Sequence, residues 1–290
     1  MKTPGRDPSP FRLLGHVVTL PPPGPGQFGP DHTVIEVIRP DQWAEADPFI
    51  LLMDDRVDGK LVGGPHPHAG FETVSFLVDG SIGSESGAGR LGPGDVEWTT
   101  AGSGIVHGSS APMEGRMRLL QLWLTLPKAQ RWTDPDHQLV PAADAPVRRG
   151  PGAEVRLFSG ETGGLRSPTR NRVPVTLVDV HLQPGAAIEQ QVPPSHNGFL
   201  YVIEGAAKVG GPTEGATLGV GQVGWLEQVA AGGPASIRVA SEGGVPLRVL
   251  LYTGERQGGT IVSYGPFIGD TRQDIVRSFE RYQTGVFRRY

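Results

Sequence analysis

The chain is 290 residues long, enough for one large domain or two ordinary ones with a sizeable core. A formal net charge of −4 with only 26 lysines and arginines predicts no broad basic surface, so direct, charge-driven binding of nucleic acid is not expected. The chain has no cysteine, which excludes disulfides, thiolate metal ligands and cysteine nucleophiles. Histidine, aspartate and glutamate are left for any metal chemistry.

The start of the chain, MKTPGRDPSPFRLLGHVVTLPPPGPG, lacks the long apolar segment of a secretion signal. No other stretch approaches the ~20 apolar residues that a helix needs to span a bilayer. We therefore expect a soluble cytoplasmic protein with no membrane partner.

Short apolar or alternating runs predict strands along the whole chain, because the 43 glycines and 28 prolines fall between these runs and not in one low-complexity block. No run is followed by the long crossover helix that a parallel sheet requires, so the pattern predicts antiparallel jelly rolls or barrels. The expected strands are 32–39, 71–78, 95–99, 118–125, 155–158, 175–182, 198–204, 222–226 and 247–252.

One helix is expected at the end of the chain. Thr271 and Asp274 form a typical helix start, and Gly285 is a natural stop. Apolar residues such as Ile275 and Phe279 recur at helical spacing between them. We expect this apolar stripe to pack on a sheet rather than to dock a partner.

The two halves of the chain repeat one sequence design. LGPGDVEW returns as LGVGQVGW with five of eight positions identical, and two further pairs match in the same order, at offsets of 127, 125 and 128 residues. Chance similarity of glycine-rich strings is the alternative, but ordered matches at nearly constant spacing favour duplication. We predict a first domain, 1–133, and a second, 153–290, joined by a proline-rich linker, 134–152.

The run HPHAGFET places His66 and His68 one residue apart, so a strand would point both imidazoles the same way. Neutral imidazole is the commonest protein ligand for metals such as Fe, Zn, Cu and Ni. His107, in AGSGIVHGSS, is the best third ligand. A chance pair, a surface pair or hydrogen-bonded turn histidines are the alternatives, but a Gly/Pro turn that leads into an apolar strand favours ligation.

The second half serves as an internal comparison for this group. His196 matches His68, but Pro194 stands in the place of His66, and the segment that answers His107 reads AAGGPAS. Because one imidazole is not a metal site, we expect His196 to be a packing or loop residue and the second domain to hold no metal.

Other polar residues are interpreted as structural. Asp95, Glu97 and Trp98 suit turn chemistry and core packing as well as they suit function. Asp54 and Asp55 in FILLMDD have no histidine partner in the sequence, so we interpret them as an ordinary acidic pair at a strand end.

Five segments carry a resemblance to a known family: HPHAGFETVSFLVDG, LGPGDVEWTTAGSGIVH, LQLWLTLP, LQPGAAIEQQVPPSHNGFLYVIEG and YGPFIGDTRQDIVRSFERYQTGVF. Together, in order and over nearly the whole chain, they resemble the pirin family of bicupins. The resemblance implies an all-β protein of two tandem cupin-type double-stranded β-barrel (jelly-roll) domains with a C-terminal helix. It also implies a single non-haem metal in the N-terminal domain, usually iron. Family activities are dioxygenation of flavonols such as quercetin and, in other members, a role in transcriptional or metabolic regulation.

The resemblance places the metal ligands on His66, His68 and His107, and on a glutamate two residues after the last histidine. This chain has Ser109 at that fourth position. A serine hydroxyl is a poorer ligand for Fe(II) than a carboxylate, and it cannot replace the carboxylate as a base for the substrate proton.

Three alternatives for the missing carboxylate stay open. Glu72, four residues after His68, occupies the place of the ligand carboxylate in the general cupin motif and is our candidate catalytic residue, although a structural hydrogen bond or salt bridge would also explain it. Water hydrogen-bonded by Ser109 would complete a three-histidine site with open positions. Glu114 is the third and weakest alternative.

The sequence thus predicts a metal-binding protein with dioxygenase activity on a flavonol or related enolizable aromatic, using O₂. Iron is the expected metal, with Zn, Ni, Mn or Cu as alternatives, and a monomer is favoured. The rival hypothesis is a non-catalytic regulatory or redox-sensing protein that binds a protein partner, which Ser109 favours. A cupin isomerase has support only from the expected fold.

Overall fold

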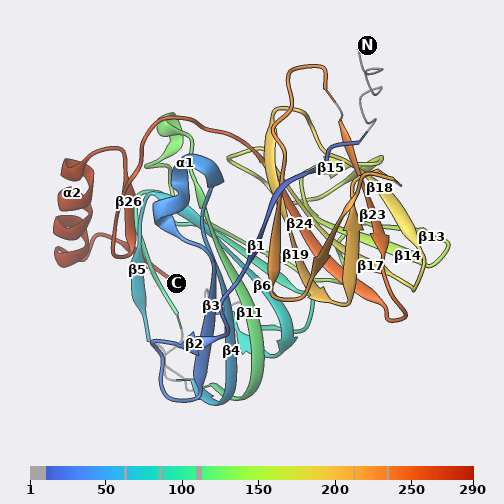
Figure 1. Ribbon diagram of the computed structural model, residues 1–290. Coiled ribbons are helices and arrows are strands. Elements are labelled where there is room, and N and C mark those ends of the chain that lie inside the picture. Colours follow the sequence, from blue (N-terminus) through green and yellow to red (C-terminus); the bar gives the residue numbers. More distant parts are fainter. Residues whose placement is uncertain are drawn as a thin grey trace. The chain divides into compact units, whose positions relative to one another are not determined.

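The computed structural model describes residues 11–61, 64–84, 87, 89–108, 113–211, 213–233 and 235–290 (Figure 1). The chain forms two compact units, which we call the first unit and the second unit. The first unit comprises Leu20–Ala145, Pro168–Pro174 and Gly254–Tyr290. The second unit comprises the segment that ends at Thr19, Pro146–Ser167 and Val175–Thr253.

The first unit contains two main sheets. The larger is an antiparallel sheet of seven strands in the spatial order β12 (Asp136–Val140), β9 (Val96–Thr100), β6 (Phe71–Gly80), β11 (Met113–Thr125), β4 (Phe49–Leu61), β3 (His32–Ile38) and β2 (Gly24–Pro25). The smaller has the order β27 (Arg288–Arg289), β10 (Ile105–His107) and β5 (His66–His68).

Short elements complete the described part of the first unit. They are the 3₁₀ turns Pro40–Gln42 and Lys128–Gln130, helix α1 (Trp43–Ala46), the strand pairs β7 (Ile82–Gly83) with β8 (Arg90–Leu91) and β25 (Val262–Tyr264) with β26 (Phe267–Gly269), and helix α2 (Arg272–Gln283). No helix in the described residues is long and apolar enough to cross a membrane.

The second unit encloses its core between two antiparallel sheets. One has the order β1 (Leu14–Thr19), β22 (Gln222–Leu226), β19 (His196–Glu204), β24 (Leu247–Glu255), β17 (Val175–Leu182), β14 (Ala153–Ser159) and β13 (Val147–Gly150). The other has the order β18 (Ala187–Gln191), β23 (Ser236–Ser241), β20 (Ala206–Val209) and β21 (Ala216–Gly219), and a hairpin joins β15 (Glu161–Thr162) to β16 (Leu165–Arg166). Alternating Val, Leu and Ile side chains from both sheets, such as Val178, Val202 and Val239, are fully buried between them.

The expected all-β architecture of two cupin-type domains is confirmed, and each of the nine predicted strands overlaps an observed one. Strand β4 is not one of these nine, although the sequence implied a strand that ends at the acidic pair of FILLMDD. Asp54 and Asp55 lie in the middle of this strand and not at its end, so the interpretation as a strand-end pair is wrong. Two arginines, Arg56 and Arg118, each approach the buried Asp54 carboxylate to 2.9 Å, which allows the charge to sit within the sheet.

The segment 134–152, expected to be a linker, contains two strands. Strand β12 pairs with β9, and β13 pairs with β14. The four prolines that suggested a linker, at 135, 141, 146 and 151, lie immediately outside these strands. Proline is tolerated at strand ends because no ladder hydrogen bond is lost there.

Each end of the chain belongs to the unit built mainly from the other half of the sequence, which differs from the predicted boundaries. β1 joins the second unit by pairing with β22, and β27 joins the first unit by pairing with β10. The expected helix, α2, therefore belongs to the first unit, where it lies beside β26 (Figure 1). Pairing between strands distant in sequence decides this membership.

Helix α2 begins and packs as its sequence predicts. Thr271 is the N-cap, its hydroxyl accepts from the Asp274 amide, and Gly285 follows the helix with φ +73°. Ile275 and Phe279 pack against Phe287 and its neighbours behind the smaller sheet. The apolar stripe is thus core packing, as expected.

Phe287 is the side chain that holds this layer against β10. It is 5% exposed, and a Cβ added to Gly104, just before β10, would lie 2.2 Å from its ring. We expect Phe287→Ala to lower the free energy of unfolding by about 3–4 kcal/mol, measured by urea denaturation. The neighbouring Val286→Ala is the control, since Val286 is 55% exposed, and an equal effect of both changes would contradict the prediction.

Candidate metal centre

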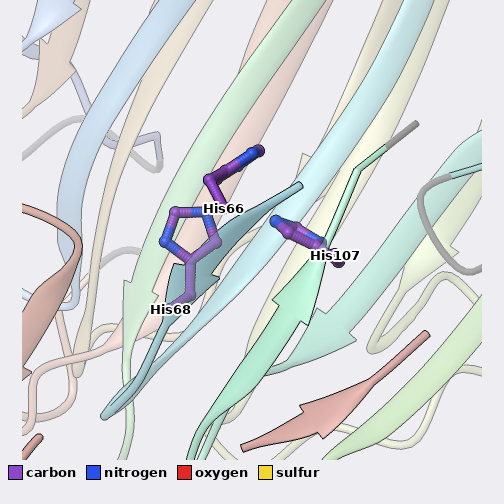
Figure 2. A group of neighbouring side chains, drawn as sticks. All are labelled: His66, His68 and His107. Carbon is purple, nitrogen blue, oxygen red and sulfur yellow. The ribbon is translucent and has the colours of Figure 1, made fainter. Parts of the chain in front are cut away.

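The candidate metal centre is formed by two three-residue strands. β5 and β10 run antiparallel, with His66 directly opposite His107 and His68 opposite Ile105. Residues that pair across a ladder share a face of the sheet, and so do residues two apart on one strand. All three imidazoles therefore lie on one face, and Figure 2 shows their rings turned toward one another.

The spacing of the three rings suits one metal ion. The ligand nitrogens all lie within 4.8 Å of one another. With metal–nitrogen distances of about 2.1 Å, two ligands of one ion lie at most about 4.2 Å apart. Small ring rotations would therefore bring the three nitrogens to a common ion, so the residues present fit a divalent metal.

Burial keeps the histidines in the form that binds metal. His68 and His107 are 3% and 1% exposed, and His66 is half-buried. Burial holds the pKa of His68 well below its usual value, helped by the neighbouring His107 and His66 and opposed by the Pro266 carbonyl. His68 is therefore neutral at pH 7 and binds a cation without first losing a proton.

Hydrogen bonding gives further support for a bound cation. His66 Nδ1 lies 2.9 Å from the Gly64 carbonyl oxygen, which can only accept, so Nδ1 carries the proton and Nε2 is the ring nitrogen with the lone pair that a metal needs. Neither ring nitrogen of His68 has a hydrogen-bond partner among the described residues. Buried polar atoms in proteins almost always have a hydrogen-bond or ligand partner, and a bound metal ion would supply the partner that the His68 ring lacks.

A buried arginine that the sequence did not single out supports the turn after β5. Arg131 is 3% exposed and donates to the Gly70 carbonyl at 3.0 Å and to Asp270 at 2.9 Å. Gly70 has φ +88°, and a Cβ there would lie 1.9 Å from the Ile268 carbonyl oxygen. Only glycine allows this close approach. An arginine that follows a short 3₁₀ turn carries no sequence signal for such a role.

Two aromatic rings border the centre, and the sequence did not single out either one. Phe71 and Trp123 lie 5.1 and 5.2 Å from the His68 ring and 4.2 Å from each other, measured between ring centroids. They come from β6 and β11, so the seven-stranded sheet turns this face toward the histidines. Their apolar surfaces keep water away from one side of the centre.

Glu72, the candidate catalytic residue, does not lie with the three histidines. It follows Phe71 on β6, so it points to the opposite face of the sheet. There it is completely buried and accepts a hydrogen bond of 2.6 Å from the Thr100 hydroxyl. This is the structural hydrogen bond that the sequence left as the alternative for this residue.

The other candidates have structural partners or lie outside the described residues. Asp95 accepts from the amides of Gly92 and Ala142, and Glu97 accepts from Ser84 and His137. Ser109 lies outside the described residues, as does the side chain of Glu114. A metal-free second unit stays a prediction, and so does a three-histidine site in which Ser109 hydrogen-bonds a water ligand.

His196, the counterpart of His68 in the second unit, is half-buried at the start of β19. Its Nδ1 lies 3.4 Å from the Thr253 hydroxyl. Burial, with the positive charge of Arg12 as a smaller cause, lowers the pKa of His196 to about 4.

The fold and the three-histidine group define a bicupin with a potential metal site in its first unit. A family model for pirin matches residues 32–124, and a model for the pirin C-terminal cupin domain matches residues 177–288. The chain belongs to the pirin family.

Individual relatives agree with this assignment. Pirin-like protein 2 of Arabidopsis thaliana is 35% identical over 245 residues, which cover 82% of this chain and 75% of the relative. A solved structure from Geobacillus kaustophilus is 36% identical with a TM-score of 0.75, covering 86% of this chain and 98% of the other. The quercetin 2,3-dioxygenase of Acinetobacter baumannii is 25% identical with a TM-score of 0.80, covering 96% and 98%.

The buried carboxyl of Glu72 makes stability depend on pH. Burial raises its pKa from 4.5 to about 7, opposed by the hydrogen bond from Thr100. Because the pKa of Glu72 is higher in the folded protein than in the unfolded chain, protonation of Glu72 stabilises the folded state. This stabilisation is fully present below pH 4.5 and is lost as the pH rises through 7. We expect Glu72→Gln to favour folding by ~2 kcal/mol more at pH 8 than at pH 5, measured by urea denaturation.

The control for this prediction is Glu189→Gln, because Glu189 is exposed on β18. Its effect on the free energy of unfolding should be small and the same at both pH values. A Glu72→Gln effect that does not change between pH 5 and pH 8 would show that the carboxyl ionises normally in the folded protein.

Proposed function

We propose that this protein holds iron through His66, His68 and His107 and catalyses dioxygenation of a flavonol or a related enolizable aromatic. The observation that carries the proposal is the convergence of three imidazoles, two buried and one half-buried, on one face of β5 and β10. The similarity to a quercetin 2,3-dioxygenase over almost the whole chain supports the substrate class. The proposed reactants are the aromatic substrate and O₂.

The chain contributes three things to this chemistry. The paired strands hold the imidazoles, and the Gly64 carbonyl orients the ring of His66 at 2.9 Å. Phe71 and Trp123 offer apolar surface beside His68, which suits a flat aromatic ligand and excludes water. A bound iron would supply redox and Lewis-acid chemistry to the substrate and O₂.

Iron is proposed over the alternative metals because dioxygenation involves electron transfer to O₂, and zinc has no redox chemistry. Nickel, manganese and copper also accept imidazole ligands, so the identity of the bound metal depends on which metal is available as well as on the preference of the site. With Ser109 in place of the family's glutamate, we propose that water completes the coordination of a three-histidine site.

Metal analysis tests the proposal directly. After anaerobic reconstitution with Fe(II), we expect about one iron per chain and quercetin-dependent O₂ uptake. His68→Ala should lose most of the metal and the uptake, since one ligand of three is removed. His16→Ala, at an exposed histidine of β1, is the control. Wild-type protein that binds no metal under these conditions would eliminate the enzyme hypothesis.

The rival function is a non-catalytic regulator that uses the metal, if it binds one, for redox sensing or structure. The observation in its favour is Ser109 at the position of the family's ligand glutamate. This function would require a protein partner, and the described surface does not identify one.

Restoring the carboxylate distinguishes the two functions. A large gain in metal retention and turnover in Ser109→Glu would indicate a native protein that has diverged from catalysis. We expect metal content by mass spectrometry and O₂ uptake to stay within about twofold of wild type, as for a functional three-histidine site. Ser110→Glu is the control for an added charge at the neighbouring position.

A further inference from the structure

A row of polar side chains lies on the sheet face turned toward the histidines. Thr73 on β6 pairs directly with Trp123 on β11 and with Thr99 on β9. Paired residues share a face, so the row crosses three strands beside the Trp123 ring, which contacts His68. Ser75, two residues after Thr73, lies on the same face one row further from the centre.

These side chains have polar atoms without partners. Thr73 Oγ1, Ser75 Oγ, Thr99 Oγ1 and Trp123 Nε1 are buried and have no hydrogen bond to any described residue. The opposite face of the same strands is better paired, since the hydroxyl of Thr100 donates to Glu72 at 2.6 Å, and two buried polar atoms, the second Glu72 oxygen and Trp98 Nε1, lack a partner there. Buried polar groups left unpaired are rare in folded proteins, and four of them in one patch require a ligand or ordered water.

The charges around the row restrict what it can bind. On this face, the described strands β6, β9 and β11 place no lysine or arginine between Phe71 and Leu77 or at the positions paired with them. Arg131 reaches Thr125 at the edge of the face, but its guanidinium is paired with Asp270. Glu97 pairs with Ser75 and is buried. His137, which pairs with Thr99, is already hydrogen-bonded to Glu97, so a carboxylate or phosphate bound at this row would lie near a buried acid with no unpaired basic side chain from these strands.

We propose that Trp123, Thr73, Thr99 and Ser75 form a recognition site for the hydroxyl and carbonyl groups of a neutral, oxygen-rich aromatic ligand. The proposal rests on the proposed function, because it assigns the part of the substrate that does not touch the metal. The Trp123 indole can only donate and meets an acceptor oxygen, whereas the three hydroxyls can donate or accept. Substrate selection at this row thus depends on the ring hydroxyls, and the row itself offers no cation to an anionic acid.

The test compares ligands that differ in hydroxyl groups. The variant Thr73→Val/Thr99→Val removes two hydroxyls with little change in shape, and Thr100→Val, on the other face of β9, is the matched control. In metal-loaded protein under anaerobic conditions, we expect the double variant to weaken quercetin binding about tenfold. The Kd of 3-hydroxyflavone, which keeps the 3-hydroxyl but lacks the A-ring and B-ring hydroxyls of quercetin, should stay unchanged, and so should metal content. Equal loss of both ligands, or no loss of quercetin, would overturn the proposal.

A second measurement needs no substrate. Removing an unpaired hydroxyl should leave the urea midpoint of Thr73→Val/Thr99→Val unchanged or raise it, whereas Thr100→Val should lower it by releasing Glu72. A lower midpoint in the double variant would mean that its hydroxyls are already satisfied and would overturn the proposal.

Small probes separate this proposal from the proposed function. If catechol binds more weakly to the double variant and benzoate does not bind, the recognition site is supported. If quercetin is not turned over in the same protein, only the dioxygenase proposal fails. If the double variant turns over quercetin normally and its ligand affinities are unchanged, the recognition-site proposal is contradicted and the dioxygenase proposal is not. Wild-type protein that binds neither quercetin nor catechol would overturn both.

Discussion

The antiparallel pairing of β5 with β10 is the interaction on which the metal centre depends. It sets His66 opposite His107, and alternation along β5 brings His68 to the same face. Strands of three residues form few hydrogen bonds, so this pairing needs support from its surroundings. β27 extends the sheet beside β10, Phe287 packs behind it, and Arg131 holds the turn that follows β5.

Alternation along the larger sheet separates two kinds of polar chemistry. One face presents Phe71, Thr73 and Trp123 toward the histidines, with polar atoms that lack partners. The other face buries Glu72 and Thr100, and the Thr100 hydroxyl donates to one oxygen of the Glu72 carboxyl. Glu72 lies four residues after His68, as the ligand carboxylate of the general cupin motif does. It nevertheless points away from the metal centre, because neighbouring positions on a strand face opposite sides of the sheet.

The two units use one fold for different environments. His68 is the last residue of β5 and His196 the first of β19, and in both units burial lowers the pKa of the histidine. In the first unit, two further histidines surround His68, whereas in the second unit the neighbours of His196 are Thr253 and the cation of Arg12. The chemistry of each unit therefore follows from the residues that pairing places around one imidazole.

The sequence by itself determined the features that arise from local patterns. Alternation, turn residues and the repeat established two β domains, the spacing of His66 and His68 indicated a metal ligand pair, and the cap at Thr271 located the helix. Only the tertiary structure decided which unit each end of the chain joins, that strands flank the prolines of 134–152, and which face carries Glu72. These depend on pairing between residues far apart in sequence, which no local pattern encodes.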